Sequence, residues 1–158
     1  MISIGIDPGI NGGICILDTK PHRGGRCTTI HVDKCPKTVK DMADYLSLYV
    51  WDSKQSLCII EKVHSFPGQG VVSTFTFGKN YGQWLGILAS LDIPYIEVPP
   101  KNWMKFYGAM PKDKKERKNH LKHLAQGIIP QVKVTLYIAD AILLANYCKQ
   151  QYISVHRP

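Results

Sequence analysis

The amino-acid sequence predicts an α/β fold: a mixed five-stranded sheet, three antiparallel strands followed by two parallel ones, flanked by helices. Three short apolar or β-branched runs open the chain, separated only by turn-forming residues, as in an antiparallel meander. Two further apolar runs alternate with segments of helical period, which is typical of parallel strands. The length of 158 residues suits one domain over residues 1–158.

The first strand, residues 2–7, ends on an aspartate. Because side chains alternate between the faces of a strand, Asp7 shares its face with the small residues Ser3 and Gly5. Pro8-Gly9 then forces a turn, since proline cannot continue a central strand and glycine tolerates positive φ. A turn-capping role and a ligand-binding role for Asp7 both fit this stretch taken alone.

The later strands are bounded by turn residues. Asn11-Gly12 and residues 21–26 have the composition of hairpin turns. The run over residues 56–63 is apolar without alternation, which predicts a central strand buried on both faces, and the loop over residues 64–72 follows it. We expect these strands over residues 14–17, 27–32, 56–63 and 94–100.

Apolar residues at helical spacing predict the helices. Ser73 or Thr74 is expected to cap the second helix. The last helix is apolar nearly all round, which is typical of burial, and Asp140 is its only carboxylate. We expect helices over residues 37–50, 73–91, 101–108, 112–128 and 135–148.

The net charge of +8 and the pI near 9.3 predict a polyanionic partner, either nucleic acid or an anionic membrane surface. No apolar run approaches the roughly eighteen residues of a membrane span, and Asp7 with Pro8-Gly9 interrupts the apolar start, so no signal peptide is expected. The five cysteines are an odd number and lack zinc-site spacing. We therefore expect a soluble protein of a reducing compartment, the cytoplasm, without disulfides or zinc.

Three of the twelve acidic residues, Asp7, Glu61 and Asp140, lie in apolar surroundings. An isolated carboxylate there is costly, so each must be paired, protonated or bound to a cation. Structural roles also fit each residue: Asp7 could cap a turn, Glu61 could pair with Lys62, and Asp140 could satisfy a donor at a helix start.

Neighbouring first and fourth strands would bring Asp7 and Glu61 to one end of the sheet, where a buried helix could add Asp140. Three converging carboxylates repel one another unless divalent cations lie between them. Oxygen ligands without histidine or thiolate favour Mg²⁺ or Mn²⁺. Two such ions about 4 Å apart would hold the attacking and leaving oxygens of a phosphodiester, so we expect a metal-dependent hydrolase.

The stretches "IGIDPG", "IIEKV" and "ADAILLA" resemble the RuvC family of Holliday junction resolvases, which have the RNase H-like fold. The segment over residues 73–108 resembles the phage-type and organellar branch of that family. The likeness implies that Asp7, Glu61 and Asp140 are the metal-binding catalytic acids. It also implies a homodimeric endonuclease of DNA recombination and repair, which nicks four-way junctions symmetrically in a bacterial or phage-infected cell.

One position departs from this family. Members commonly carry a further Asp or His one helical turn before the last catalytic Asp, and this chain has Tyr137 there. A phenol, with a pKa near 10, is a poor Mg²⁺ ligand at neutral pH. Three explanations of this difference fit the sequence. Three acids and water could suffice to hold the ions, the second ion could be weakly held, or the chain could have lost its activity.

The window over residues 101–123 is strongly basic and lies near the helix that carries Asp140. Runs of charge usually form a solvated helix face, but this one has eight Lys and Arg residues against only Asp113 and Glu116, which favours contact with phosphates. Lys105 and Lys114 are the first candidates. The whole candidate set is Lys101, Lys105, Lys114, Lys115 and Lys118.

An aromatic wedge that stacks on bases at the junction crossover is implied by the same resemblance, in the loop after Glu61. Phe66 and Phe75 are the candidates, and His64 is a weaker one. Phe77 fits better as a core residue of the following helix.

Gly78, Gly82 and Gly86 recur every four residues in the helix over residues 73–91. Each costs about 1 kcal/mol relative to alanine inside a helix, so something must pack closely on this stripe. Either the sheet of the same chain or a second copy would satisfy that need, and the family resemblance favours a dimer interface.

Other functions fit parts of the sequence. An RNase H-like nuclease for other branched, flap or RNA-containing substrates would need the same three acids. A junction-binding protein without catalysis is motivated by Tyr137. The segment "IDPGINGG" could pass for the phosphate loop of an actin-like ATPase, but that fold needs two such domains.

Overall fold

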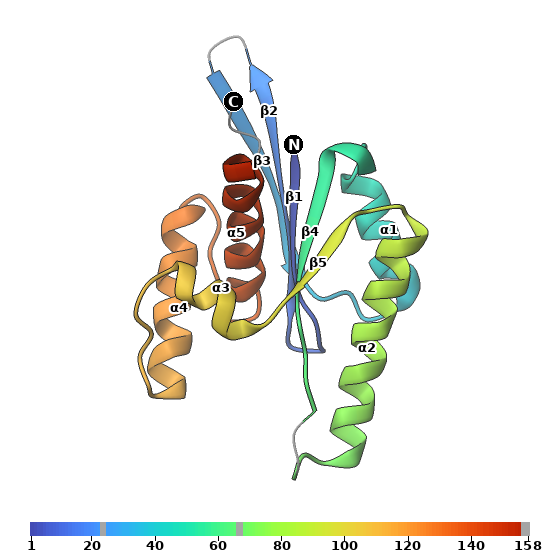
Figure 1. Cartoon of the computed structure of the whole chain (residues 1–158), viewed down its shortest axis with the longest axis vertical. Coiled ribbons are helices and arrows are strands. Elements are labelled where there is room, and N and C mark those ends of the chain that lie inside the picture. Colours follow the sequence, from blue (N-terminus) through green and yellow to red (C-terminus); the bar gives the residue numbers. More distant parts are fainter. Residues whose placement is uncertain (23–24, 66–67, 156–158) are drawn as a thin grey trace.

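The computed structural model describes residues 1–22, 25–65 and 68–155, and in it a five-stranded sheet separates two layers of helices (Figure 1). The strand order is β3-β2-β1-β4-β5. Strands β1, β2 and β3 pair antiparallel, whereas β4 pairs parallel to both β1 and β5. The strands are β1 (Ile2–Asp7), β2 (Gly13–His22), β3 (Gly25–Lys34), β4 (Ser56–Glu61) and β5 (Tyr95–Val98). The sheet predicted from the sequence is therefore confirmed.

Helices cover both faces of the sheet, with α1 and α2 on one side and α3, α4 and α5 on the other (Figure 1). The 3₁₀ turn η1 (Ser53–Gln55), which the sequence did not predict, precedes β4. No described helix is long and apolar enough to cross a membrane. The helices are α1 (Val39–Tyr49), α2 (Val71–Ser90), α3 (Pro100–Phe106), α4 (Lys114–Ile128) and α5 (Ala139–Val155).

Each face of the sheet has its own apolar core. The isoleucines of β1 are fully buried against α1 and α2, together with Met42 and Trp84. On the other face, α5 packs directly on β1, and a Cβ at Gly5 would lie 2.2 Å from the carbonyl oxygen of Ala141. Only glycine permits this approach, which explains the small face noted for the first strand. The cysteines Cys15, Cys35, Cys58 and Cys148 are buried free thiols.

Several predicted boundaries were wrong, and each difference has a local cause. The turn expected over residues 21–26 is shorter, because β2 and β3 continue to His22 and from Gly25, with Thr19 hydrogen-bonded to Thr28 across the pair. The proposed cap at Ser73 or Thr74 is wrong, since α2 begins at Val71 after Gly70, which makes no side-chain cap bond.

The start of α5 was predicted four residues too early. The backbone N–H of Ile142 donates to the carbonyl of Ile138, so the helix begins at Ala139. Asp140 therefore lies in the first turn rather than in the middle of the helix, at the end where the helix dipole favours a negative charge. Burial of the apolar part of α5 is confirmed, since Ala141 to Ala145 are fully buried.

Candidate active site

Asp7, Glu61 and Asp140 lie at one edge of the sheet. The parallel pairing of Ile6 with Ile60 brings the next residues, Asp7 and Glu61, to the ends of adjacent strands. Asp140 reaches the same edge because the first turns of α5 pack over β1. The three acids that the sequence singled out, from three separate elements, thus share one location.

The three carboxyl groups act on one another electrostatically. Burial raises the pKa of Asp7 well above its usual value, and the charges of Glu61 and Asp140 raise it further. Burial, together with the charge of Asp140, raises the pKa of Glu61 to about 7. The pKa of Asp140 is also raised by burial. A site that disfavours its own negative charge in this way is suited to receive a cation.

Lys118 of α4 lowers the pKa of each of the three acids, against the effect of burial. This lysine belongs to the basic segment predicted to contact nucleic acid, and its ammonium group therefore lies within electrostatic reach of the acid edge. The Lys118 side chain is exposed, so solvent weakens its interaction with the three carboxyl groups. A substrate phosphate near the acids would lie within reach of the same positive charge.

Trp103 orients Glu61, a role that the sequence analysis missed. Its indole Nε1–H donates a 2.8 Å hydrogen bond to Oε2 of Glu61 and opposes the rise in the pKa of that carboxyl group. Trp103 is fully buried in α3, where the indole N–H needs an acceptor. In the sequence, this role could have been suspected only from the presence of a tryptophan in the short helix that follows the strand expected over residues 94–100.

The turn after Asp7 is attached to α2. The N–H of Gly9 donates to Oδ1 of Asn80 at 2.7 Å, and Gly9 has a φ of +117°, which disfavours other residues. A Cβ at Gly9 would also lie 2.9 Å from the ring of Phe77. Phe77 is therefore half-buried against this turn, and Asn80 is a second residue whose contribution to the site was not anticipated.

Tyr137 lies beside this edge, in the turn before α5. Its carbonyl oxygen would be 2.7 Å from a Cβ on Gly13, and Gly13 pairs with Asp7 across β1 and β2. The ammonium group of Lys34 lies 4.2 Å from the centroid of the Tyr137 ring. The position where the family resemblance implied a further acid thus holds a phenol with a lysine over its ring.

The acids supply suitable ligands for Mg²⁺ or Mn²⁺, because all are carboxylates and neither histidine nor thiolate is needed. Within the described part of the chain, no three His, Cys, Asp or Glu side chains already form a metal-binding cluster. The residue types and the raised pKa values fit a hard cation, and the side chains would have to turn toward it to bind.

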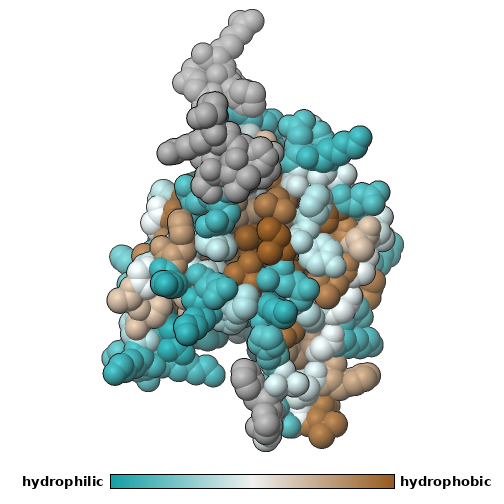
Figure 2. All heavy atoms as spheres, in the orientation of Figure 1, coloured by the Kyte–Doolittle hydropathy of each residue, from teal (hydrophilic) through white to brown (hydrophobic). Residues whose placement is uncertain are grey.

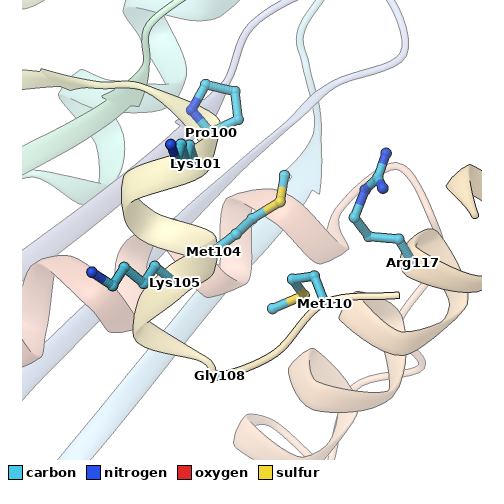
Figure 3. A pocket seen from close by; sticks show the side chains of 7 residues that line it. All are labelled: Pro100, Lys101, Met104, Lys105, Gly108, Met110 and Arg117. Atoms are coloured by element: carbon cyan, nitrogen blue, oxygen red, sulfur yellow. The ribbon is translucent and has the colours of Figure 1, made fainter. Parts of the chain in front are cut away.

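The predicted basic residues lie on α3 and α4, and the charge of Lys118 reaches the acids. Lys101 and Lys105 project from α3 (Figure 3), and Lys114, Lys115 and Lys118 lie on α4. All five are exposed. Hydrophilic surface gathers over α4 at the lower left of the space-filling view (Figure 2).

The aromatic candidates have different positions. Phe75 is 73% exposed in the first turns of α2, with Val71 and Val72 exposed beside it. Apolar surface is visible there at the lower right of Figure 2. Its exposure excludes Phe75 from the core and leaves it accessible to a partner. Phe66 lies outside the described residues, and His64 is exposed.

The glycine stripe has no close neighbour among residues 1–22, 25–65 and 68–155. A Cβ on Gly78, Gly82 or Gly86 would meet nothing within 4 Å. The sheet of the same chain therefore does not pack on the stripe, which corrects the first of the two expectations. Phe77, Asn80 and Trp84 occupy the opposite face of α2 and hold it to the rest of the fold.

Comparison with solved structures identifies the fold. The chain is similar to RuvC from Thermus thermophilus over 98% of this chain and 96% of that one, with a TM-score of 0.61 and 17% identity. T. thermophilus RuvC in complex with a Holliday junction substrate gives a TM-score of 0.62 at 14% identity, with 99% and 97% coverage.

Fowlpox virus resolvase in complex with Holliday junction DNA matches over 99% of this chain and 100% of that one, with a TM-score of 0.50 and 15% identity. No protein-family model and no curated protein sequence matches the chain. The RNase H-like fold implied by the sequence resemblance is confirmed along nearly the whole chain.

Proposed function

We propose that this chain is a structure-selective endonuclease that resolves four-way DNA junctions by paired symmetric nicks. The observation that carries this proposal is the meeting of Asp7, Glu61 and Asp140 at one edge of a fold similar to two junction resolvases. We propose that residues 1–158 act as one nuclease domain, in a reducing cytoplasm that suits the free buried thiols.

Asp7, Glu61 and Asp140 are the residues that would hold divalent ions, which we propose to be two Mg²⁺ or Mn²⁺ per site. When bound, such ions polarise the phosphodiester and lower the pKa of the attacking water. Trp103 holds Glu61 in place through its 2.8 Å hydrogen bond, and the attachment of Gly9 to Asn80 fixes the turn that follows Asp7.

The basic residues of α3 and α4 would hold the DNA backbone beside these acids. Lys118 acts on all three carboxyl groups, so its charge also offsets the repulsion between the acids and an approaching phosphate. Lys101, Lys105, Lys114 and Lys115 are exposed and extend the positive surface along α3 and α4. In the first turns of α2, Phe75 is exposed and could stack on an unpaired base, as is proposed for Phe66.

Symmetric nicking requires two acid sites, which a homodimer would supply. The open stripe of Gly78, Gly82 and Gly86 supports contact with a second copy, because helices approach closely where no side chain intervenes. The exposed Val71 and Val72 at the N-terminal end of α2 add apolar surface near it.

Cleavage of a labelled four-way junction in Mg²⁺ and in Mn²⁺ tests the proposal. Flap, RNA–DNA hybrid and linear duplex substrates run in parallel, and paired nicks confined to the junction are expected. Preference for a flap or hybrid would instead favour an RNase H-like nuclease of another substrate class. Tight junction binding without cleavage in either metal would favour a non-catalytic binding protein, the alternative that the Lys34–Tyr137 contact motivates.

A further inference from the structure

A cavity of about 450 Å³ opens between α3 and the start of α4 (Figure 3). Its volume lies in the range of small-ligand sites. Met104 projects from α3 toward Arg117 of α4, and Met110 lies on the connection between these helices (Figure 3). The residues that matter here are the cations Lys101, Lys105 and Arg117 and the apolar residues Pro100, Met104 and Met110.

Hydrogen bonds hold both walls of the cavity in place. On one wall, α3 is fixed by the hydrogen bond from Trp103 to Glu61 and by Tyr107, whose hydroxyl donates to the carbonyl oxygen of Leu143 at 2.6 Å. On the other, Nη1 of Arg117 donates to the carbonyl oxygens of Pro111 and Lys112, each at 3.1 Å, and fixes the connection that carries Met110. The cavity is thus a preformed feature.

The lining combines two kinds of recognition. Thioethers and a proline ring offer polarisable apolar surface, which packs well on a flat aromatic ring. Lysine and arginine at the rim bind phosphate oxygens, and the lining includes no carboxylate. A ligand with a planar ring at one end and a phosphate at the other matches both, and a nucleotide is such a ligand.

The cavity opens on the face of α3 next to the one that faces the acid edge, because successive residues of a helix point about 100° apart. Trp103 points to Glu61, whereas the next residue, Met104, lines the cavity. The acid edge and the cavity therefore adjoin the same short helix, α3. We propose that the cavity takes one nucleotide of the bound DNA, with its base against Met104 and Met110 and its phosphate at the lysine and arginine rim.

This inference rests on the proposed nuclease function and adds a site at which the identity of one base affects the rate of cleavage. A wild-type enzyme is then expected to cleave junctions that differ at one position near the cut with rates that differ by about tenfold, within the usual cost of a mismatched base.

Methyl NMR of the full chain tests the cavity without any cleavage. The probes are the labelled methionine methyls, and the titrants are dTMP, dAMP and inorganic phosphate. Ring currents from a bound base should move the Met104 and Met110 signals upfield, whereas Met42, buried on the other face of the sheet, should not move. Met104→Leu and Met110→Leu assign the signals with little change in volume.

Equal shifts with inorganic phosphate and with the nucleotides would show an anion site and overturn the proposal, as would the absence of shifts at both methyls. Because this measurement does not involve catalysis, its failure is separate from failure of the junction cleavage assay. In a second test, Met110→Glu should reduce the base preference of cleavage to within about twofold. An unchanged preference would contradict the inference, and Leu48→Glu on the exposed face of α1 is the control.

Discussion

The ammonium group of Lys34 lies 4.2 Å from the centre of the Tyr137 ring, beside the edge where β1 ends. A cation at this distance from an aromatic face is attracted by the ring quadrupole. The same lysine would attract a carboxylate placed at position 137. The tyrosine and the lysine therefore have to be considered together when a further metal ligand is introduced.

Tyr137→Asp is expected to raise cleavage activity at limiting Mg²⁺ or Mn²⁺, because it adds a hard oxygen ligand near Asp7. The gain should be larger when Lys34→Ala is added, since the lysine no longer competes with the ion for the new carboxylate. Activity measured against metal concentration checks both steps. Tyr137→Phe retains the ring and serves as the control, and no gain in either metal would contradict the idea that a missing ligand limits this enzyme.

Removing any one acid should abolish cleavage and preserve junction binding. Asp7→Asn, Glu61→Gln and Asp140→Asn keep the size of each side chain but remove a charged metal ligand. Cleavage and gel-shift assays on the same junction separate the two effects. Asp44→Asn, on α1 and paired with Lys40, is the control and should cleave normally. Wild-type turnover by one of the three variants would remove that residue from the site.

The stability of the metal-free protein should fall as the pH rises, because Glu61 has a raised pKa. Below its ordinary pKa of 4.5 this carboxyl group is protonated in both the folded and the unfolded state. As the pH rises from 4.5 to about 7, the unfolded state ionises while burial keeps the folded carboxyl group protonated, so the free energy of unfolding falls over this range and levels off above it. Since one pKa unit corresponds to about 1.4 kcal/mol, the loss is at most about 3 kcal/mol.

Urea unfolding at pH 5 and pH 8 in a chelator tests this effect. Glu61→Gln should gain stability relative to the wild type at pH 8 and gain little at pH 5, because glutamine cannot ionise and still accepts the Trp103 hydrogen bond. Added Mg²⁺ should restore part of the wild-type stability at pH 8. An equal difference between the two proteins at both pH values would rule out Glu61 as the source.

Much of the fold and of the acid site could be predicted from the sequence, because both follow from local sequence patterns. Apolar runs and turn residues predicted three antiparallel strands followed by two parallel ones, and three acids in apolar surroundings indicated that Asp7, Glu61 and Asp140 could lie together. The hydrogen-bond partners that hold these groups in place could not be predicted from the sequence. The Trp103–Glu61 hydrogen bond joins residues 42 positions apart, and the Gly9–Asn80 bond joins residues 71 apart. Periodicity reports which side chains are buried, not which distant acceptor satisfies them.

Gly82→Leu is expected to convert a dimer into a folded monomer. A Cβ at Gly82 meets nothing within 4 Å in the isolated chain, so leucine fits there and gains about 1 kcal/mol of helix propensity. In a dimer packed on the stripe, the same side chain would prevent close approach of the second copy. Sedimentation measures the mass, and thermal unfolding confirms the fold.

The matched control for this change is Gly127→Leu. Gly127 lies in α4 and also has nothing within 4 Å of its Cβ position, so it tests helix propensity without the stripe. It should be stabilising and leave the dimer intact. A Gly82→Leu protein with the wild-type mass would place the dimer contact elsewhere.

Lys105 and Lys114 should carry part of the salt dependence of junction binding. Each phosphate contact releases counterions and contributes about 0.9 to the slope of log affinity against log salt on duplex DNA. Lys105→Ala combined with Lys114→Ala should therefore lower the slope by roughly two, measured in Ca²⁺ so that no cleavage occurs. Lys54→Ala is the control, because Lys54 is exposed on η1, beside α1 and away from α3 and α4. A double variant with the parent slope would place this basic surface away from the DNA, even if the acids prove essential for cleavage.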